Sequence, residues 1–186
     1  MEKLNLFHTG FEIIKNPDIA LGRKNADFGQ GFYLSGSKEF SLRWAKQRKG
    51  LVTYLNAYEL TADGLNIKRL TRNEEWFEYI YDNRSGYPDS KKENDVIIGP
   101  IANDTLYDTW GIITSGLLKR DIALSLLLGG PLYEQTVIKT EKALSRLRFT
   151  DAREINVEEI EEDRETVKRE EKEYQKYVSD TMEMFL

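Results

Sequence analysis

Two short segments near the amino terminus contain the side chains of this chain that are best suited to recognition chemistry. Residues 6–10 (LFHTG) hold the only histidine, His8, and residues 27–35 (DFGQGFYLS) place Tyr33 just after a pair of glycines. The glycines permit a tight turn beneath a flat ring. A single histidine at the end of an apolar strand is more often a structural residue, and glycine pairs beside aromatic residues are common in β-turns. Neither segment therefore identifies a site alone.

A predicted helix follows the second segment. Ser35 or Ser37 can cap its amino terminus, and larger side chains then recur at helical spacing. Ser41 and Trp44 are three residues apart, so they share one face of this helix. A serine there is ordinarily a solvent residue and a tryptophan a core residue. The two residues are informative because they follow Tyr33 by eight and eleven residues.

The rest of the chain supplies the elements that must position these side chains. Helices are predicted at 74–81 and within 106–128, with a turn or short helix at 140–145. Strands are predicted at 4–9, 32–35, 51–60, 65–70, 95–100, 135–139 and 146–149. Most neighbouring strands are joined by turns too short for a crossover helix. This favours an antiparallel α+β domain over a doubly wound fold.

Length and composition restrict the class of protein. The 186 residues, 40% hydrophobic and 32% charged, suffice for one compact domain with a real core. The absence of cysteine excludes disulfides, a thiolate zinc site and a catalytic thiol, and a single histidine excludes a histidine-rich metal site, so we expect no metal. The opening residues show no apolar run, and residues 122–128 are too short to span a membrane. We expect a cytoplasmic protein of bacterial or phage origin without membrane association.

The negative charge is concentrated at the carboxyl terminus. The chain has 27 basic and 32 acidic residues; residues 151–186 hold 6 and 13 of these, which leaves 21 and 19 for residues 1–150. The first part is therefore near neutral, with no broad basic surface for nucleic acid. We expect one domain over residues 1–150 and a charged helical tail over residues 151–186, appended to the domain and outside its active site.

The two amino-terminal segments resemble the opening of the NAD site in the ADP-ribosyltransferase superfamily, in the branch of poly-ADP-ribose polymerases and diphtheria-type toxins. There a first strand ends in aromatic-His-Gly-Ser/Thr. The resemblance implies that His8 hydrogen-bonds the adenosine ribose and that the backbone of Thr9 holds the nicotinamide amide. Gly10 stands one residue later than the glycine of the family pattern.

The second segment is similar to the Phe-Gly-Lys-Gly-Ile-Tyr-Phe run of the polymerases, which implies that Tyr33 stacks on nicotinamide. Family members carry a serine eight residues after this tyrosine, on the carboxamide, and an aromatic residue three later, closing the stack. Ser41 and Trp44 occupy these places. The implied NAD-binding residues are His8, Thr9, Gly10, Phe28, Gly29, Gly31, Tyr33, Ser41 and Trp44.

The carboxyl-terminal motif of the superfamily begins with a glutamate that opens a strand. That glutamate contacts the 2′-hydroxyl of the nicotinamide ribose and stabilises positive charge as nicotinamide leaves. Alignment on the strand at 135–139 places Gln135 at this position and Glu134 one residue before it. A shift of one residue would turn Glu134 inward instead, because facing alternates along a strand. We prefer Gln135 and keep Glu134 as the alternative; if Gln135 is correct, Gln135→Glu is expected to retain or raise NAD cleavage.

A narrower resemblance extends to Phe149. A bacterial family of unknown function, placed in the same superfamily, is similar in the opening segments and again at residues 76–84, 95–104 and 135–149. This resemblance implies that glutamine is normal at position 135. Members of that family are suspected toxins or effectors.

These resemblances imply a split β-sandwich of the ADP-ribosyltransferase type: two antiparallel sheets, flanking helices and a C-terminal acidic helix. They imply a mono-ADP-ribosyltransferase, a glycosyltransferase that uses NAD as a substrate and releases nicotinamide, with His8, Tyr33 and Gln135 or Glu134 as catalytic residues. The macromolecular acceptor is expected to be a protein, with nucleic acid not excluded, and the toxin reading leaves room for a neutralising partner protein. The alternatives are an NAD glycohydrolase and a catalytically weak NAD-binding module.

Overall fold

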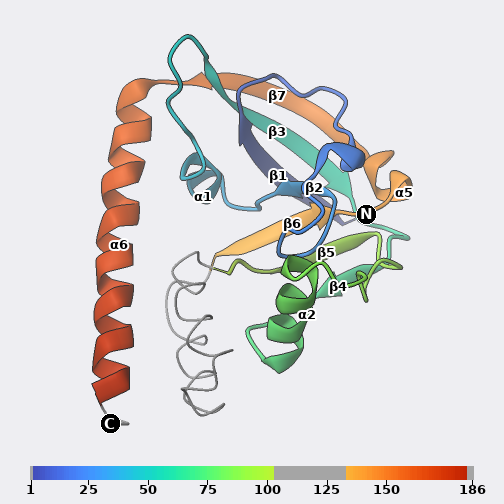
Figure 1. Cartoon of the computed structure of the whole chain (residues 1–186). Helices are drawn as coiled ribbons and strands as arrows, with labels where there is room; N and C mark the ends of the chain where they lie inside the picture. Colours follow the sequence, from blue (N-terminus) through green and yellow to red (C-terminus); the bar gives the residue numbers. More distant parts are fainter. Residues whose placement is uncertain (1, 103–132, 184–186) are drawn as a thin grey trace.

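Two β-sheets form the body of the molecule, with helices on their outer sides (Figure 1). The structure is a computed structural model that describes residues 2–102 and 133–183. A three-stranded antiparallel sheet has the order β1 (Lys3–Gly10), β3 (Thr53–Thr61), β7 (Leu147–Ile155). A four-stranded sheet has the order β2 (Phe32–Leu34), β6 (Glu134–Ile138), β5 (Val96–Pro100), β4 (Ile67–Arg69). The α+β class expected from the sequence is confirmed.

The four-stranded sheet is mixed, which corrects the expectation of two purely antiparallel sheets. Strands β4 and β5 run parallel, whereas β2 and β5 both pair antiparallel with β6. The connection from β4 to β5 contains helix α2 (Glu74–Arg84), which provides the crossover that a parallel pair requires. The helix is predictable from the local sequence pattern, whereas the direction of β5 is not.

One hydrophobic core fills the space between the two sheets. Alternate residues of each strand face it, among them the fully buried Leu6, Leu34 and Ile138. Tyr58 also lies in this core, with its hydroxyl donating to the Ile14 carbonyl at 2.7 Å. Each such large apolar side chain contributes roughly 1.5–3 kcal/mol by leaving water. This core fixes which face of β1 and β2 points inward.

A second core lies on the opposite face of the four-stranded sheet, under α2. Trp76 and Tyr79 of the helix pack with Phe28, Ile97 and Val137. Asn73 caps the helix by accepting from the backbone N–H of Trp76 at 3.0 Å, as expected for a helix that starts at residue 74. The indole of Trp76 donates to the Pro100 carbonyl at 2.8 Å. Helix α2 is thereby held against the end of β5.

A pair of backbone hydrogen bonds joins the two sheets. The N–H of Phe7 donates to the Ser35 carbonyl at 2.8 Å, and the N–H of Ser35 donates to the Phe7 carbonyl at 2.9 Å. Strand β1 therefore touches the end of β2 as well as β3. His8 and Tyr33, far apart in sequence, are neighbours because of this bridge.

Helix α1 (Lys38–Leu42) is shorter than the predicted pattern. Ser37 caps it by accepting from the N–H of Phe40 at 3.0 Å, as one of the two expected caps. The helix ends at Leu42, and Trp44 lies in the following turn, its N–H donating to the Ser41 carbonyl at 3.2 Å. Two further short helices are the 3-10 helix η1 (Ile19–Leu21) and α5 (Glu141–Leu144).

The carboxyl-terminal region is a strand followed by one long helix. Strand β7 pairs with β3 as far as Ile155, so it crosses the domain boundary expected after residue 150. Helix α6 (Val157–Glu183) then runs along one side of the molecule, past α1 (Figure 1). Its buried apolar residues Ile160 and Tyr174 pack against the body in two different clusters.

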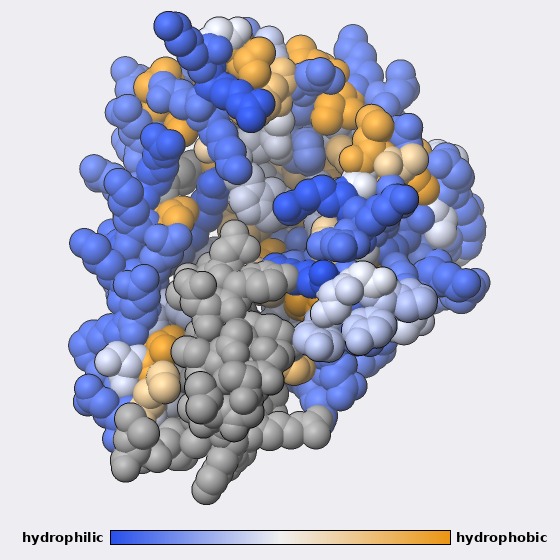
Figure 2. Space-filling view, viewed as in Figure 1, coloured by the Kyte–Doolittle hydropathy of each residue, from blue (hydrophilic) through white to orange (hydrophobic). Residues whose placement is uncertain are grey.

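The outer side of α6 is mainly hydrophilic (Figure 2). In the described parts of the chain, no helix combines the length and the apolar character that a membrane span needs. The predicted helices within residues 106–128 lie outside the described residues.

Candidate functional site

The candidate site lies where β1 meets β2. Nδ1 of His8 is 2.8 Å from the Tyr33 carbonyl oxygen, and the His8 ring centroid is 4.8 Å from that of Phe32. A carbonyl oxygen only accepts hydrogen bonds, so Nδ1 carries the hydrogen and donates it. Burial lowers the pKa of His8 from its usual value, although the hydrogen bond to Tyr33 opposes the shift. The imidazole is therefore neutral at pH 7, with Nε2 as an acceptor.

Gly10 leaves space beside that acceptor. A side-chain carbon at this position would lie 3.4 Å from Nε2 of His8. This distance is at the limit of ordinary van der Waals contact, so a side chain at position 10 would lie directly against Nε2. The glycine that stands one residue late in the sequence pattern thus leaves no side chain of its own beside this edge of the His8 ring.

Thr9 and Ser41 connect β1 to helix α1. The hydroxyl of Thr9 donates to the Ser41 carbonyl at 2.6 Å. The hydroxyl of Ser41 lies 3.1 Å from the Ser37 carbonyl and 3.3 Å from the Phe7 carbonyl, and the residue is completely buried. In this arrangement Ser41 fastens the helix to the strand, and its donor hydrogen is used by the backbone.

The hydroxyl of Tyr33 is hydrogen-bonded to the glycine-rich turn. The hydroxyl donates to the Gly29 carbonyl at 2.7 Å and accepts from the Phe28 N–H at 2.9 Å. Burial strongly raises the pKa of Tyr33, while the hydrogen bond from Phe28 acts in the opposite direction. The phenol is therefore neutral at any physiological pH, and its ring is held in one orientation.

Both glycines of the turn are required by the space around them. Gly29 has φ of 72°, in the left-handed region, and a side-chain carbon there would lie 2.9 Å from both Asn83 Oδ1 and Asp89 Oδ2. A side-chain carbon on Gly31 would lie 2.5 Å from the Ile138 carbonyl oxygen. The turn is thus pressed against β6 and against a polar network behind it.

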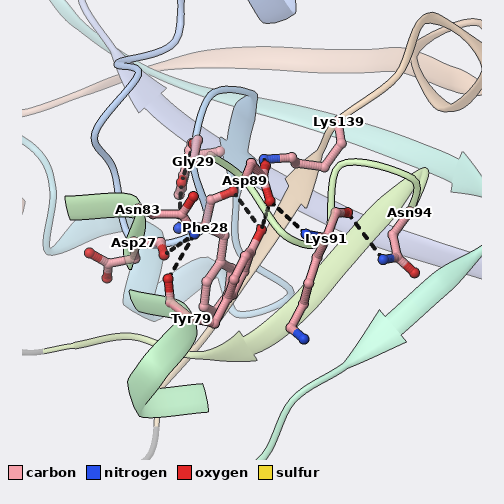
Figure 3. A network of polar contacts seen from close by, with 10 residues as sticks. Asp27, Phe28, Gly29, Tyr79, Asn83, Asp89, Lys91, Asn94 and Lys139 are labelled. Atoms are coloured by element: carbon pink, nitrogen blue, oxygen red, sulfur yellow. Dashed lines mark hydrogen bonds and ion pairs between the residues drawn. The ribbon is translucent and has the colours of Figure 1, made fainter. Parts of the chain in front are cut away.

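That network centres on a buried lysine (Figure 3). Lys139 donates to Asp89 Oδ2 at 2.6 Å and to the carbonyl oxygen of Phe28, and its side chain is only 4% exposed. Tyr79 donates to Asp89 Oδ1 at 2.8 Å. Burial lowers the pKa of Lys139, and Asp89 opposes this shift. Burial alone would raise the pKa of Asp89, but hydrogen bonds from Lys139 and from the N–H of Lys91 bring it below the usual value.

Sequence reasoning missed these supporting residues. Lys139 stands at the end of a predicted strand and carries no local sign of burial, and Asp89 lies in a polar loop. Their partnership depends on the packing of that loop against β6. The crowding at Gly29, which a glycine in a tight turn suggests, was the only available hint.

Gln135 and Glu134 lie on opposite faces of β6. Tyr33 pairs with Val137, so Gln135, two residues earlier, is on the same face as Tyr33. Gln135 is buried, and its Nε2 donates to Asp27 Oδ2 at 3.2 Å. Glu134 is exposed, and its backbone carbonyl accepts from the Ser35 hydroxyl at 3.1 Å. Of the two candidates, the buried one shares the face of Tyr33.

Asp27 is a further site residue, to which sequence reasoning gave no role. Besides Gln135, its Oδ2 accepts from the Ala102 N–H at 3.2 Å, and its Oδ1 pairs with the guanidinium of Arg84. Both charged side chains are mostly buried. Its place at the start of the glycine-rich segment was the available signal.

Trp44 belongs to an aromatic cluster that reaches α6. Its ring meets Phe40 edge-on at 5.0 Å, and Phe40 stacks on Tyr133 at 4.6 Å. The guanidinium of Arg43 lies 4.2 Å from the centroid of the Tyr133 ring and forms a two-point ion pair with Glu170. The Tyr133 hydroxyl donates to the same carboxylate at 2.8 Å. Helix α6 therefore helps to position the turn that carries Trp44.

Comparison with known protein families gives a match over most of the chain. The model of a family described as "Protein of unknown function (DUF3990)" matches residues 4–149, which include every strand described above apart from the first residue of β1 and the last part of β7. No curated protein and no solved structure matches the chain.

Proposed function

The chain belongs to the protein family of unknown function DUF3990, and we propose that it transfers ADP-ribose from NAD to a macromolecular acceptor with release of nicotinamide. The observation that carries this proposal is the placement of His8, Tyr33 and Gln135 around one junction of the two sheets. These residues come from three different strands. The sequence resemblance assigns each of them a separate part of NAD.

His8 supplies an acceptor for a hydroxyl group. With its Nδ1 hydrogen donated to the Tyr33 carbonyl, its Nε2 is suited to accept a hydrogen bond from the adenosine ribose. Gly10 keeps the approach to that nitrogen open. The neutral state of the ring, which its lowered pKa favours, preserves this acceptor at pH 7.

Tyr33 supplies a rigid flat surface. Its hydroxyl is tied to the turn at both Phe28 and Gly29, so little side-chain freedom remains to be lost when a ring stacks on it. An aromatic stacking contact adds about 0.5–1.5 kcal/mol beyond simple burial. Nicotinamide is a flat heteroaromatic ring, and the buried phenol stays uncharged beside its positive ring nitrogen.

The proposed reaction requires no oxidant or reductant. The bond between C1′ of the ribose and the nicotinamide nitrogen breaks, and its electron pair neutralises the pyridinium. A new bond then forms between C1′ and a nucleophilic atom of the acceptor, whose proton passes to solvent. If water takes the place of the acceptor, the same step is NAD hydrolysis.

The amide of Gln135 is the reason that NAD hydrolysis and NAD binding without turnover remain alternatives to transfer. An amide oxygen can hold a ribose hydroxyl but carries no full charge to oppose the positive charge that develops at C1′. Loss of one preorganised electrostatic group costs about 2.7–4 kcal/mol of barrier in other enzymes. The chain is therefore expected to be a slow transferase, and slow NAD hydrolysis and NAD binding without turnover are the competing outcomes.

One assay separates the three outcomes. The full chain is incubated with NAD labelled in its adenosine part, together with a bacterial lysate, and the label is followed. Label on macromolecules supports transfer, and protease or nuclease treatment then identifies the acceptor as protein or nucleic acid. Free ADP-ribose without labelled macromolecules indicates a glycohydrolase, and unchanged NAD that is nevertheless bound indicates a binding module. Absence of both binding and turnover refutes the proposal.

A further inference from the structure

The amide of Gln135 is held in one orientation by a carboxylate. Within the described residues its side chain bonds to Asp27, and the contact runs from Nε2 to Oδ2 at 3.2 Å. An ionised carboxylate can only accept hydrogen bonds, so the NH2 end of the amide must point toward Asp27. The carbonyl end, Oε1, then points away from Asp27.

Asp27 is itself fixed from three directions. Arg84, in the last turn of α2, pairs with Oδ1, and the Ala102 N–H donates to Oδ2. The Asp27 carbonyl accepts from the Asn83 side chain at 3.2 Å. Every one of these partners is a donor. The carboxylate is therefore a rigid acceptor placed directly against the Gln135 side chain.

We propose that Asp27 is the positioning residue of Gln135: it turns the amide so that Oε1 accepts the 2′-hydroxyl of the nicotinamide ribose. The inference rests on the proposed function and specifies how a glutamine serves at this position. Oε1 takes the place of one carboxylate oxygen of the glutamate that the superfamily resemblance leads one to expect. Oε1 can act as this acceptor only while Asp27 accepts a hydrogen bond from the NH2 end of the same amide.

The same geometry explains why the chain carries glutamine. A glutamate at position 135 would set a second carboxylate against Asp27, with both residues largely buried. Two carboxylates in contact cannot both remain ionised without a large free-energy cost, and one of them must take up a proton. Our proposal therefore predicts the opposite of the expectation from sequence alone, that Gln135→Glu retains or raises NAD cleavage.

A donor–acceptor swap tests the inference in the full chain. Four proteins are compared: the wild type, Gln135→Glu, Asp27→Asn and the double variant D27N/Q135E. The double variant exchanges the two groups, so that the amide donates from position 27 to the carboxylate at position 135. Asp63→Asn, at an exposed aspartate in the turn between β3 and β4, is the matched control.

We expect Gln135→Glu to lower kcat/KM for NAD cleavage about a hundredfold and to lower the melting temperature. Both quantities should rise as the pH falls from about 8 to about 5, because protonation of the carboxylate pair relieves the repulsion. The double variant should recover about tenfold of the lost kcat/KM and lose that pH dependence, since the swap restores the hydrogen bond between positions 27 and 135. Recovery is expected to be incomplete, because the new amide NH2 at position 27 replaces the oxygen that accepts from the Ala102 N–H.

Two results would overturn the positioning role. One is a Gln135→Glu protein as active and as stable as the wild type at pH 7.5, and the other is a double variant no better than Gln135→Glu. If Asp27→Asn alone fails to fold, the comparison between Gln135→Glu and the double variant still decides. A wild-type protein that neither binds nor cleaves NAD refutes the proposed function, which is a separate result. In that case the melting temperatures of the four proteins still show whether Asp27 orients the amide of Gln135.

Discussion

At the scale of single residues, the hydroxyl of Tyr33 combines two tasks that a phenylalanine could not perform. It closes the glycine-rich turn by bonding to Phe28 and Gly29, and it fixes the plane of its own ring. Its neighbour His8 is oriented by the Tyr33 carbonyl. A change at this one position therefore affects the turn and the ring surface directly and His8 indirectly.

Replacement of this ring is the sharpest test of NAD recognition. Tyr33→Ala removes the stacking surface, so we expect NAD affinity to fall about tenfold or more while the sheets remain folded. Binding is measured by isothermal titration and folding by circular dichroism. Tyr87→Ala, at an exposed tyrosine, is the control and should bind NAD as the wild type does. Unchanged affinity in Tyr33→Ala would show that NAD does not lie on this ring.

Some residues of the candidate site can be predicted from sequence and others cannot. Gly29 and Tyr33 carry local information, because a positive φ and a following strand are consequences of turn chemistry. The contact of Gln135 with Asp27 joins two segments that no local pattern relates. The same holds for the ion pair of Lys139 and Asp89, which forms only when the loop that contains Asp89 packs on β6.

At the scale of elements, Asp95 links the start of β5 to neighbouring elements through its side chain. It accepts hydrogen bonds from the Asn66 N–H, the Thr140 hydroxyl and Lys142, so it ties β5 to the residues before β4 and to α5. Burial alone would raise the pKa of Asp95, but the hydrogen bonds from Lys142, Asn66 and Thr140 lower it to about 2. This carboxylate therefore stabilises the fold only in its charged form.

Asp95 gives a prediction for acid stability. Its pKa is lower in the folded chain than its usual 3.8. Its contribution is therefore fully present above about pH 4 and is lost as the pH falls toward 2, and it amounts to roughly 2 kcal/mol. Asp95→Asn should lower the free energy of unfolding by up to that amount at pH 7 and leave a shallower loss of stability between pH 4 and pH 2. Urea unfolding at several pH values measures this, and equal acid sensitivity in variant and wild type would contradict it.

The ion pair between α1 and α6 gives a second prediction for elements. Glu170→Ala leaves Arg43 and the Tyr133 hydroxyl without their shared acceptor. We expect a loss of roughly 1–3 kcal/mol in stability and weaker NAD binding, because Trp44 follows Arg43 directly. Glu171→Ala, at the exposed neighbouring glutamate, is the control for removing a charge from the same helix. A Glu170→Ala protein with wild-type stability would show that α6 does not support this turn.

The elements themselves are largely predictable, for a reason visible in β5. Its run of apolar residues ends in a Gly-Pro pair, and the observed strand Val96–Pro100 follows that pattern. Its parallel pairing with β4 is a property of the whole sheet and leaves no local trace. The same distinction applies to β7, in which residues 150–154 are exposed or half-buried and alternate too weakly to predict the full strand.

At the scale of the whole molecule, the family unit and the folded unit do not end at the same place. The family match ends at residue 149, whereas β7 continues to Ile155 and pairs with β3 along its length. The buried Ile160 and Tyr174 then attach α6 to the body. The boundary at which a fragment remains folded is therefore set by the strand.

Truncation distinguishes these boundaries. A chain ending at Asn156 keeps all of β7, so we expect it to fold with reduced stability, because two buried contacts of α6 are lost. A chain ending at Thr150 also loses the pairing of residues 151–155 with β3 and should be insoluble or unfolded. Circular dichroism and size-exclusion chromatography compare the two fragments. Equal folding of both would place the structural boundary at residue 150 after all.

The position of β6 has a consequence for the time at which the site comes into existence. This strand is among the last to be synthesised, yet it lies between β2 and β5, and it carries Gln135 on the face of Tyr33. While β6 is still to be synthesised, β2 and β5 therefore have no strand between them. Pairing of strands so distant in sequence is slow, because the long intervening loop must first be closed. Any activity toward NAD is thus withheld until β6 has been synthesised and has paired with β2 and β5.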